Sequence, residues 1–191
     1  MPENAIQAAP DRARPLRDAL GRFSTGVAIV TTLTDEGGDR GVTVNSFSSV
    51  SLDPPLVLFS LARLSTSFAT FEQARHFTIN VLSQKQKLAS NRFTRPTGLA
   101  WDNVEYERGA NGCAILRESL AWFECERHAQ YDGGDHLIFL GHVTAFGATE
   151  NGADPLVFYR GNYGSFLGDE RVHPDLSGPL GDFSAYGWGG M

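Results

Sequence analysis

The sequence predicts a mainly β fold in one domain, a closed or nearly closed β-barrel with a few helices packed outside it. Short apolar, β-branched runs follow one another between clusters of Gly, Pro, Asn and Asp, as is typical of strands joined by turns. Strands and helices do not alternate as in a doubly wound sheet, and no internal repeat occurs. The 191 residues suit one domain of ordinary size.

The two ends of the chain are expected to lie outside this domain. Residues 1–12 are polar and patternless, so we expect them to be mobile, and residues 169–191 are Gly-rich and aperiodic, so we expect a tail. The domain should therefore cover residues 13–168. It should open with a short helix that has Pro15 in its first turn and is ended by Gly26. The apolar face of this helix has helical spacing in Leu16, Ala19, Leu20 and Phe23.

Strands should begin directly after this helix. Residues 27–34 and 41–46 are expected to pair around a turn at 35–39. The continuous apolar run at 56–61 follows two prolines and predicts a strand buried on both faces. Another strand is expected over residues 77–82.

Two helices and a long hairpin complete the predicted domain. The helices should cover residues 66–74 and 84–93, and the first has Ser65 as its expected N-cap, with Ser67 as a competitor. Residues 120–131 and 136–146 should form the hairpin, and residues 156–160 a last strand.

Composition excludes several classes of protein. The net charge of −6 argues against nucleic acid as the main partner. No apolar run approaches the ~20 residues that span a bilayer, and the N-terminus does not resemble a secretory signal. Cys113 and Cys125 form no C-x-x-C pair, so we expect buried, reduced thiols and a cytoplasmic protein.

Several common catalytic motifs are absent. The sequence contains no G-x-G-x-x-G, Walker A, H-E-x-x-H or G-x-S-x-G motif, which argues against a Rossmann nucleotide site and most NTPases, zinc proteases and α/β-hydrolases. His128, His136 and His142 could suggest a metal site. No carboxylate or cysteine stands at convincing ligand spacing from them, so we predict none.

Polar side chains crowd the end of the second predicted strand, over residues 43–51. Main-chain amides with small hydroxyl and amide side chains suit the rim of a flat heteroaromatic ring. Residues 60–67 join a strand to a helix start, where free N–H groups, hydroxyls and Arg63 could hold a phosphate. Ordinary local hydrogen bonds and N-capping explain the same residues equally well.

Three further places could contribute to a site. Arg92 could reach a phosphate or complement the dipole of its helix. His136 follows a tight turn and could project into a pocket or be structural. Residues 158–164 interleave aromatics with Arg160 and glycines, which could stack on a nicotinamide or adenine or form the rim of the core.

The order of these segments resembles the flavin reductase-like family, the reductase components of two-component flavin-dependent monooxygenases. The resemblance covers roughly residues 16–166, and its most specific parts are Asn45-Ser46-Phe47 and Gly134-Asp135-His136. It also includes residues 26–32, 53–57, 77–82 and 155–161.

This resemblance implies a split β-barrel, usually a homodimer, with NAD(P)H:flavin oxidoreductase activity that supplies reduced flavin to a partner monooxygenase. It implies FMN or FAD and NADH or NADPH, with hydride passing from nicotinamide C4 to flavin N5. By carry-over, the flavin would contact Thr43, Val44, Asn45, Ser46, Ser49, Ser51, Ser60, Leu61, Ser65, Thr66, Ser67, Asn91 and Arg92. The nicotinamide would contact His136, Tyr159, Arg160, Gly161 and Tyr163, with His136 as the catalytic candidate.

Two points of this assignment stay open. Many members of the family are basic where Thr66 stands, so Arg63 or Arg92 would carry the phosphate charge here. A non-catalytic flavin- or haem-binding barrel, serving as a sensor or store, is the main alternative function. An oxidase of the pyridoxamine-phosphate type would need basic residues that the sequence does not show, and a barrel acting only by protein contact remains a further alternative.

Overall fold

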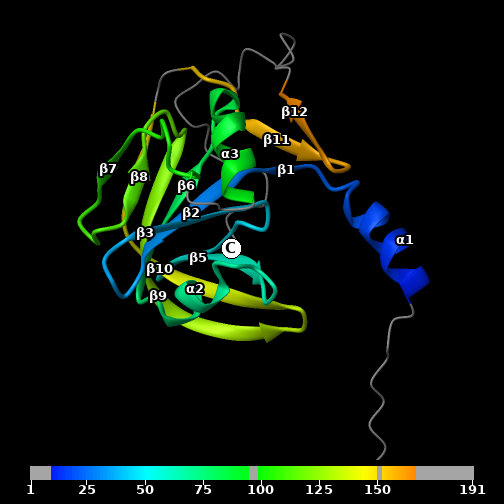
Figure 1. Cartoon of the computed structure of the whole chain (residues 1–191), viewed down its shortest axis with the longest axis horizontal. Helices are drawn as coiled ribbons and strands as arrows, with labels where there is room; N and C mark the ends of the chain where they lie inside the picture. The colour runs from blue at the N-terminus through cyan, green and yellow to red at the C-terminus, as the bar shows by residue number, and fades with distance from the viewer. Residues whose placement is uncertain (1–9, 95–98, 150–151, 167–191) are drawn as a thin grey trace, which may run out of the picture.

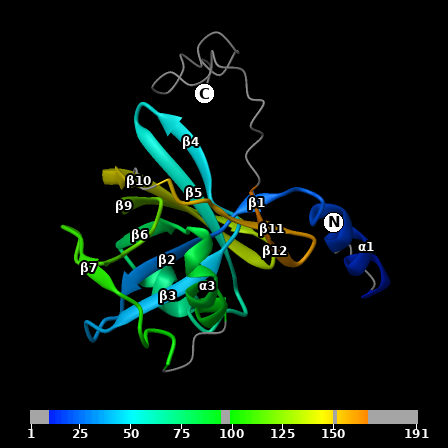
Figure 2. The same ribbon diagram turned by 90° about the horizontal axis from the view of Figure 1, so that it is seen from above.

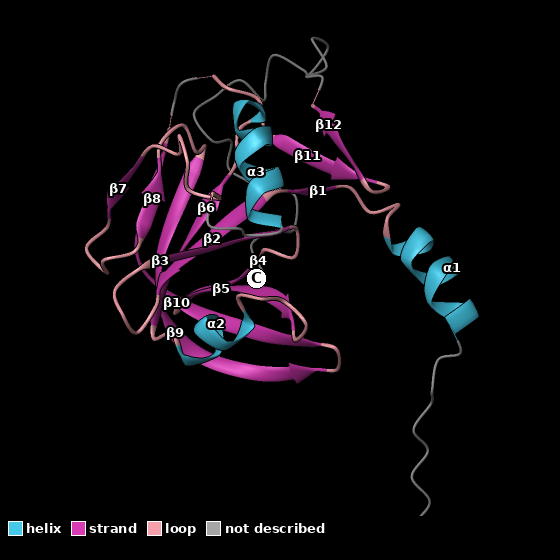
Figure 3. Ribbon diagram, viewed as in Figure 1, coloured by secondary structure: helices cyan, strands magenta, loops and turns pink. Residues whose placement is uncertain are grey.

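A computed structural model describes residues 10–94, 99–149 and 152–166. The fold is mainly β, as predicted (Figures 1 and 3). Its helices are α1 (Pro10–Leu20), α2 (Phe68–Gln73), the 3-10 turn η1 (Gln84–Gln86) and α3 (Lys87–Thr94). Its strands are β1 (Thr25–Gly26), β2 (Ala28–Leu33), β3 (Asp39–Val44), β4 (Ser48–Leu52), β5 (Pro55–Ala62), β6 (His76–Val81), β7 (Tyr106–Arg108), β8 (Ala114–Leu116), β9 (Ala121–Gly133), β10 (His136–Ala148), β11 (Leu156–Tyr159) and β12 (Asn162–Ser165).

Seven antiparallel strands form the main sheet, in the order β3-β2-β6-β9-β10-β5-β4. The expected closed or split barrel is not closed by hydrogen bonds, because no strand ladder among the described residues joins the end strands β3 and β4. The sheet curls, and the β4–β5 ribbon extends away from the rest (Figure 2). The free edge of β3 therefore keeps unpaired main-chain groups.

Five strands were not predicted. The two-residue β1 lies where the first helix was expected to end, at Gly26. The Ser-rich exit after β3 turns back as β4, which pairs with β5. The loop after α3 contains the short hairpin β7–β8, and β11 continues into β12 through a two-residue turn. The small sheet β1-β11-β12 lies at the same end of the molecule as α3 (Figure 1). Strands this short carry little alternation, so the periodicity signal is too weak to find them.

Strand β2 lies between two hydrophobic cores. Ala28 and Val30 belong to one core, where the Phe59 and Phe139 rings stack with centroids 4.8 Å apart. Ile29 belongs to the other, which includes residues of α3, β8 and β11. The predicted strand at 27–34 is thus buried on both faces.

Three local predictions are corrected by the structure. Helix α1 starts at Pro10 and is followed by Gly21, whose N–H bonds to the Arg17 carbonyl, so Gly26 does not end it. Strand β5 alternates between buried and half-buried residues instead of being fully buried on both faces, because only one face meets the aromatic core. Ser67, and not Ser65, occupies the N-cap position of α2, without a side-chain capping bond.

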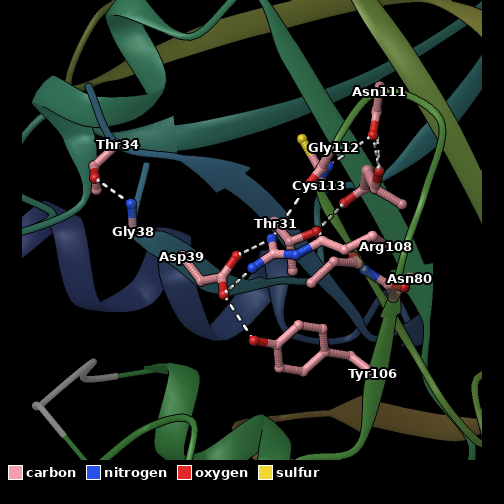
Figure 4. A network of polar contacts seen from close by, with 12 residues as sticks. Thr31, Thr34, Gly38, Asp39, Asn80, Tyr106, Arg108, Asn111, Gly112 and Cys113 are labelled. Atoms are coloured by element: carbon pink, nitrogen blue, oxygen red, sulfur yellow. Dashed lines mark hydrogen bonds and ion pairs between the residues drawn. The ribbon is translucent and has the colours of Figure 1, made fainter. Parts of the chain in front are cut away.

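The β7–β8 hairpin is fastened to the main sheet by a set of polar contacts that we call the clasp (Figure 4). Arg108 forms a two-pronged ion pair with Asp39, at 2.5 and 2.9 Å, and the Tyr106 hydroxyl donates to the same carboxylate at 2.9 Å. Asn80, which is fully buried, donates to the Ile29 and Ala114 carbonyls and accepts from the Leu116 N–H. The clasp therefore satisfies buried polar groups between elements far apart in sequence.

Both cysteines are buried and unpaired. Burial raises the pKa of the Cys113 thiol to about 11 and that of Cys125 to about 12. The raised pKa favours the protonated thiol, and the expectation that both cysteines are buried is confirmed. No helix in the described part of the chain is long and apolar enough to cross a bilayer.

Candidate active site

Two neighbouring cavities form a groove along the end of β3, which we call the central groove. The histidine cavity, of about 680 Å³, is lined by Val42, Thr43, Val44, Asn45, Ser46, Ser60, Leu61, Ala62, Leu64, Ser65, Thr66, Thr94 and His136. The tyrosine cavity, of about 540 Å³, is lined by Val27, Thr43, Val44, Asn45, Asn91, Thr94, Phe158, Gly161 and Tyr163. Each cavity has the volume of a cofactor site, and residues 43–45 form part of the wall of both.

The structure brings most of the predicted site residues together in this groove. Contributions come from β3, the loop before α2, helix α3, the start of β10 and the β11–β12 turn. The predicted residues that line it are Thr43, Val44, Asn45, Ser46, Ser60, Leu61, Ser65, Thr66, Asn91, His136, Gly161 and Tyr163. These come from segments more than 100 residues apart in the sequence, so the fold itself assembles the site.

Six predicted residues do not line the central groove. Ser49 and Ser51 lie on β4, and Ser67 is buried beneath the loop with no partner for its hydroxyl among the described residues. Arg92 lies on another face of α3, where it donates to the Asp102 carbonyl. Tyr159 and Arg160 border other hollows of the surface.

Two of the hydroxyls that line the groove serve its construction. The Thr43 hydroxyl donates to the Ser90 carbonyl at 2.7 Å and so joins β3 to α3. The Ser46 hydroxyl donates to the Ser60 carbonyl and accepts from the Ser60 N–H, at 3.0 and 2.9 Å. The Ser46–Ser60 pair thus holds the chain after β3 against β5, where no strand ladder closes the sheet.

Other polar groups in the groove are free to bind a ligand. Within the described residues, the side chains of Asn45, Asn91 and Thr66 and the hydroxyl of Ser60 form no hydrogen bond to protein. All four belong to uncharged side chains that can donate and accept hydrogen bonds. Such a lining suits a ligand with ring carbonyls, ring nitrogens and hydroxyls.

His136 stands at one end of the groove, as the first residue of β10. Its Nδ1 lies 2.7 Å from the Asp135 carboxylate, and its side chain is 44% exposed. This contact with His136 holds the pKa of Asp135 below its usual range. The carboxylate orients the imidazole and leaves Nε2 available to a ligand.

Arg63 braces the turn that carries His136. Its guanidinium donates to the Asp132 carboxylate at 2.7 Å and to the Gly134 carbonyl at 3.1 Å. The main-chain N–H of Arg63 donates to the Asp135 carbonyl at 2.9 Å. The ion pair with Arg63 also lowers the pKa of Asp132. Arg63 is therefore committed to the turn, and the suggestion that it carries a phosphate charge finds no support in this geometry.

The other end of the groove is built around Tyr163. Its hydroxyl lies 2.8 Å from the Ser90 hydroxyl, and the Lys87 ammonium lies 5.7 Å from its ring centre. The Phe158 ring meets it edge to face at 5.6 Å. These contacts fix an aromatic ring at the wall of the tyrosine cavity, where a planar ligand could pack on it.

Sequence reasoning missed some residues of the lining. Thr94 lines both cavities and lies one helical turn after Asn91, so helical spacing could have identified it. The apolar wall residues Val27, Val42, Ala62 and Leu64 carry no polar signal. Among the described residues, no group of three His, Cys, Asp or Glu side chains is placed to hold a metal ion.

The groove can bind a planar, polar-edged ring but offers little acid–base chemistry of its own. His136 and Tyr163 are the ionisable side chains in the lining of the two cavities. The fit to a flavin is good, because the free amides and hydroxyls match its ring edge and polyol chain. A reaction here would depend on chemistry that a bound cofactor supplies.

Comparisons with known proteins agree with this geometry. The family model described as Flavin reductase like domain matches residues 20–167. The FMN reductase (NADH) SmoA of Agrobacterium fabrum is 46% identical over 164 residues, which are 86% of this chain and 92% of that protein. The reductase component of the flavin-dependent trigonelline monooxygenase of Acinetobacter baylyi is 43% identical, over 81% of this chain and 49% of that protein.

Solved structures show the same relationship. The NADH:FAD oxidoreductase SgcE6 of Streptomyces globisporus, in complex with NAD and FAD fragments, superposes with a TM-score of 0.78 at 32% identity, covering 85% of this chain and 97% of that one. The nitrilotriacetate monooxygenase component B homologue of Mycobacterium thermoresistibile gives 0.77 at 35% identity, over 88% and 96% of the two chains. The chain belongs to the flavin reductase-like family, as its motifs indicated.

Proposed function

We propose that this protein is an NAD(P)H:flavin oxidoreductase that works in the central groove. The observation that carries the proposal is the convergence of free, uncharged polar side chains from β3, β5 and α3 beside His136. Relatives named as NADH-dependent FMN or flavin reductases support the same activity, and they do not favour a non-catalytic flavin- or haem-binding barrel.

In this proposal the flavin lies along the end of β3, with its ring edge against Asn45 and the neighbouring main chain. A bound flavin supplies N5 as the hydride acceptor, and a reduced nicotinamide supplies the hydride from C4. Ser60, Ser65 and Thr66, which line the groove, would hold the polyol and phosphate side, and Asn91 with Thr94 would cover it. The protein contributes binding, orientation and the exclusion of water.

We assign His136 to the nicotinamide, with Gly161 and Tyr163 across the groove. Asp135 holds the His136 imidazole, and Arg63 holds the turn that carries it. The imidazole Nε2 can therefore orient the nicotinamide carboxamide or pass a proton to the flavin. The positions of Ser49, Ser51, Ser67 and Arg92 give no support to a direct flavin contact from those side chains.

The test is His136→Ala, with His142→Ala on the same strand as the matched control. His142 lines neither cavity. We expect the KM for NADH to rise about tenfold in His136→Ala, while the flavin dissociation constant stays within a factor of two. Equal steady-state kinetics in the two variants would remove the assignment of His136. A wild-type protein that does not oxidise NADH when FMN or FAD is added would remove the proposed function.

Assembly and cellular context are part of the proposal. Relatives named as reductase components of monooxygenases support a partner oxygenase that consumes the reduced flavin. A homodimer is supported by the unpaired edge of β4, where Leu52 is 84% exposed. The protonated, unpaired thiols support a reducing, cytoplasmic setting. Light scattering after gel filtration tests the dimer.

A further inference from the structure

A third cavity extends the central groove toward α1. It has a volume of about 660 Å³ and shares Asn45, Phe158 and Gly161 with the tyrosine cavity. Arg17 and Arg22 line it from α1 and the turn after it. We call it the arginine cavity because Arg160, from the β11–β12 turn, completes a set of three arginines.

These three arginines form no ion pairs with other described residues. Within the part of the chain that the structure describes, their guanidinium groups form no ion pair and no side-chain hydrogen bond. One carboxylate, Asp18, lines the same cavity, which leaves a local excess of positive charge in a chain of net charge −6. By contrast, Arg63, Arg75 and Arg108 all pair with carboxylates.

The backbone of Arg160 gives an independent indication that its side chain is needed. Arg160 and Gly161 are the two central residues of the β11–β12 turn, and both have positive φ, +49° and +80°. Turns of this type favour Asn-Gly or Gly-Gly, because a long side chain is disfavoured in the left-handed region. The Arg160 N–H also donates to the Gly21 carbonyl at 2.9 Å, which holds the turn against the end of α1.

Two large apolar side chains in the lining of the arginine cavity are exposed. Leu20 is 67% exposed and Phe23 is 77% exposed, and both border the cavity. Figure 1 shows α1 standing away from the body on the side of the β11–β12 turn and the tip of the β9–β10 hairpin. Arg17 is close enough to that tip to add to the effect of His136 in lowering the pKa of Asp135.

We propose that the arginine cavity binds the diphosphate of a dinucleotide whose redox ring lies in the central groove. Arginine matches the geometry of phosphate oxygens, and three converging arginines suit the two charges of a diphosphate. Leu20 and Phe23 would then cover the adenine. The dinucleotide is the reduced nicotinamide dinucleotide, because its ring is assigned beside Gly161 and Tyr163, next to this cavity, whereas the flavin phosphate is assigned to Ser60, Ser65 and Thr66 in the histidine cavity. This inference rests on the proposed function.

The experiment compares dinucleotide with mononucleotide substrates in Arg17→Gln and Arg160→Asn. Asn tolerates the left-handed conformation, so the second variant keeps the turn. Arg14→Gln is the matched control, because Arg14 is exposed on α1 and does not line the cavity. Rates are measured with FAD against FMN at fixed NADH, and with NADH against reduced nicotinamide mononucleotide at fixed FMN.

Both cavity variants should raise the KM ratio of NADH to reduced nicotinamide mononucleotide at least fivefold and leave the ratio of FAD to FMN unchanged. A rise in the FAD-to-FMN ratio instead would place FAD in the arginine cavity and overturn the assignment. Arg14→Gln should change neither ratio. Unchanged ratios in both cavity variants would overturn the inference. Failure of the proposed function is a separate result, because wild type would then reduce no flavin with any nicotinamide.

Discussion

The clasp contacts β3 at its first residue, Asp39, and the central groove lies along its end, and the two regions use polar residues in opposite ways. In the clasp, the Asn80 amide forms three hydrogen bonds to protein. Asn111, in the loop between β7 and β8, joins the same network: its amide donates to the Phe77 carbonyl and the Thr78 hydroxyl and accepts from the Cys113 N–H. In the groove, Asn45 and Asn91 make none with the described residues. The same side-chain type therefore stabilises the fold in one region and remains available for a ligand in the other.

The difference follows from burial. A buried amide must find a protein partner, since its desolvation is otherwise uncompensated. An amide at the wall of an open groove is hydrated until a ligand arrives, so it costs little in the free protein. Substitutions in the two regions should therefore separate stability from binding.

The largest expected effect is Asn80→Ala in the clasp. The Leu116 N–H would lose its acceptor and the Ile29 carbonyl would lose a donor in a fully buried position, while the Ala114 carbonyl would keep the Thr31 hydroxyl. We expect the free energy of unfolding to fall by roughly 3 kcal/mol. Urea unfolding measures this, with Asn91→Ala as the control, which should change stability by less than ~0.5 kcal/mol. Similar losses in both variants would contradict the comparison.

Breaking the ion pair of the clasp should have a smaller effect. Asp39→Asn weakens the two-pronged contact with Arg108 and the bond from the Tyr106 hydroxyl, all of which are partly exposed. We expect a loss of about 1–2 kcal/mol in the free energy of unfolding. Asp35→Asn, in the exposed turn before β3, is the matched control and should have no measurable effect.

Asn45→Ala tests the groove side of the comparison. We expect the flavin dissociation constant to rise about tenfold, equivalent to ~1.4 kcal/mol of binding free energy. The free energy of unfolding should stay within ~0.5 kcal/mol of wild type. Flavin fluorescence titration measures the first quantity and urea unfolding the second. Ser49→Ala on β4 provides the control for binding, and an equal loss of affinity there would place the flavin outside the groove.

The smallest effect concerns pH. The hydrogen bond to Asp39, followed by burial, raises the pKa of Tyr106 above that of an unfolded tyrosine. Its contribution to stability is therefore present below about pH 10 and is lost as pH rises through the folded pKa. Unfolding measured between pH 8 and pH 11 should show this loss in wild type and a shallower one in Tyr106→Phe. Identical slopes would show that Asp39 does not act on Tyr106.

The sequence was a good guide to the long elements of this fold. The β2–β3 and β9–β10 hairpins were predicted because apolar, β-branched runs flank Gly- and Asp-rich turns. β1, β4, β7, β8 and β12 were missed because they have only two to five residues each. The open sheet was not foreseen either, since whether the end strands pair depends on tertiary geometry.

The site was predicted from the order of its motifs more than from any single residue. Asn45 and His136 were named because the Asn-Ser-Phe and Gly-Asp-His segments resemble a known family. The direction in which Arg92 points was not accessible, because one residue along a helix turns the side chain by about 100°. The pairing of Ser46 with Ser60 was likewise invisible, because the two are joined only by the folded structure.

The burial of β2 on both faces has a consequence for how the domain unfolds. Because Val30 packs in one core and Ile29 in the other, loosening either core removes the support of a strand that both require. The amide protons of β2 should therefore exchange with solvent only when the whole domain opens, and should be the slowest set in the molecule. The end of β3 pairs with β2, so the ligand groove is built on the strand whose amide protons are expected to exchange most slowly.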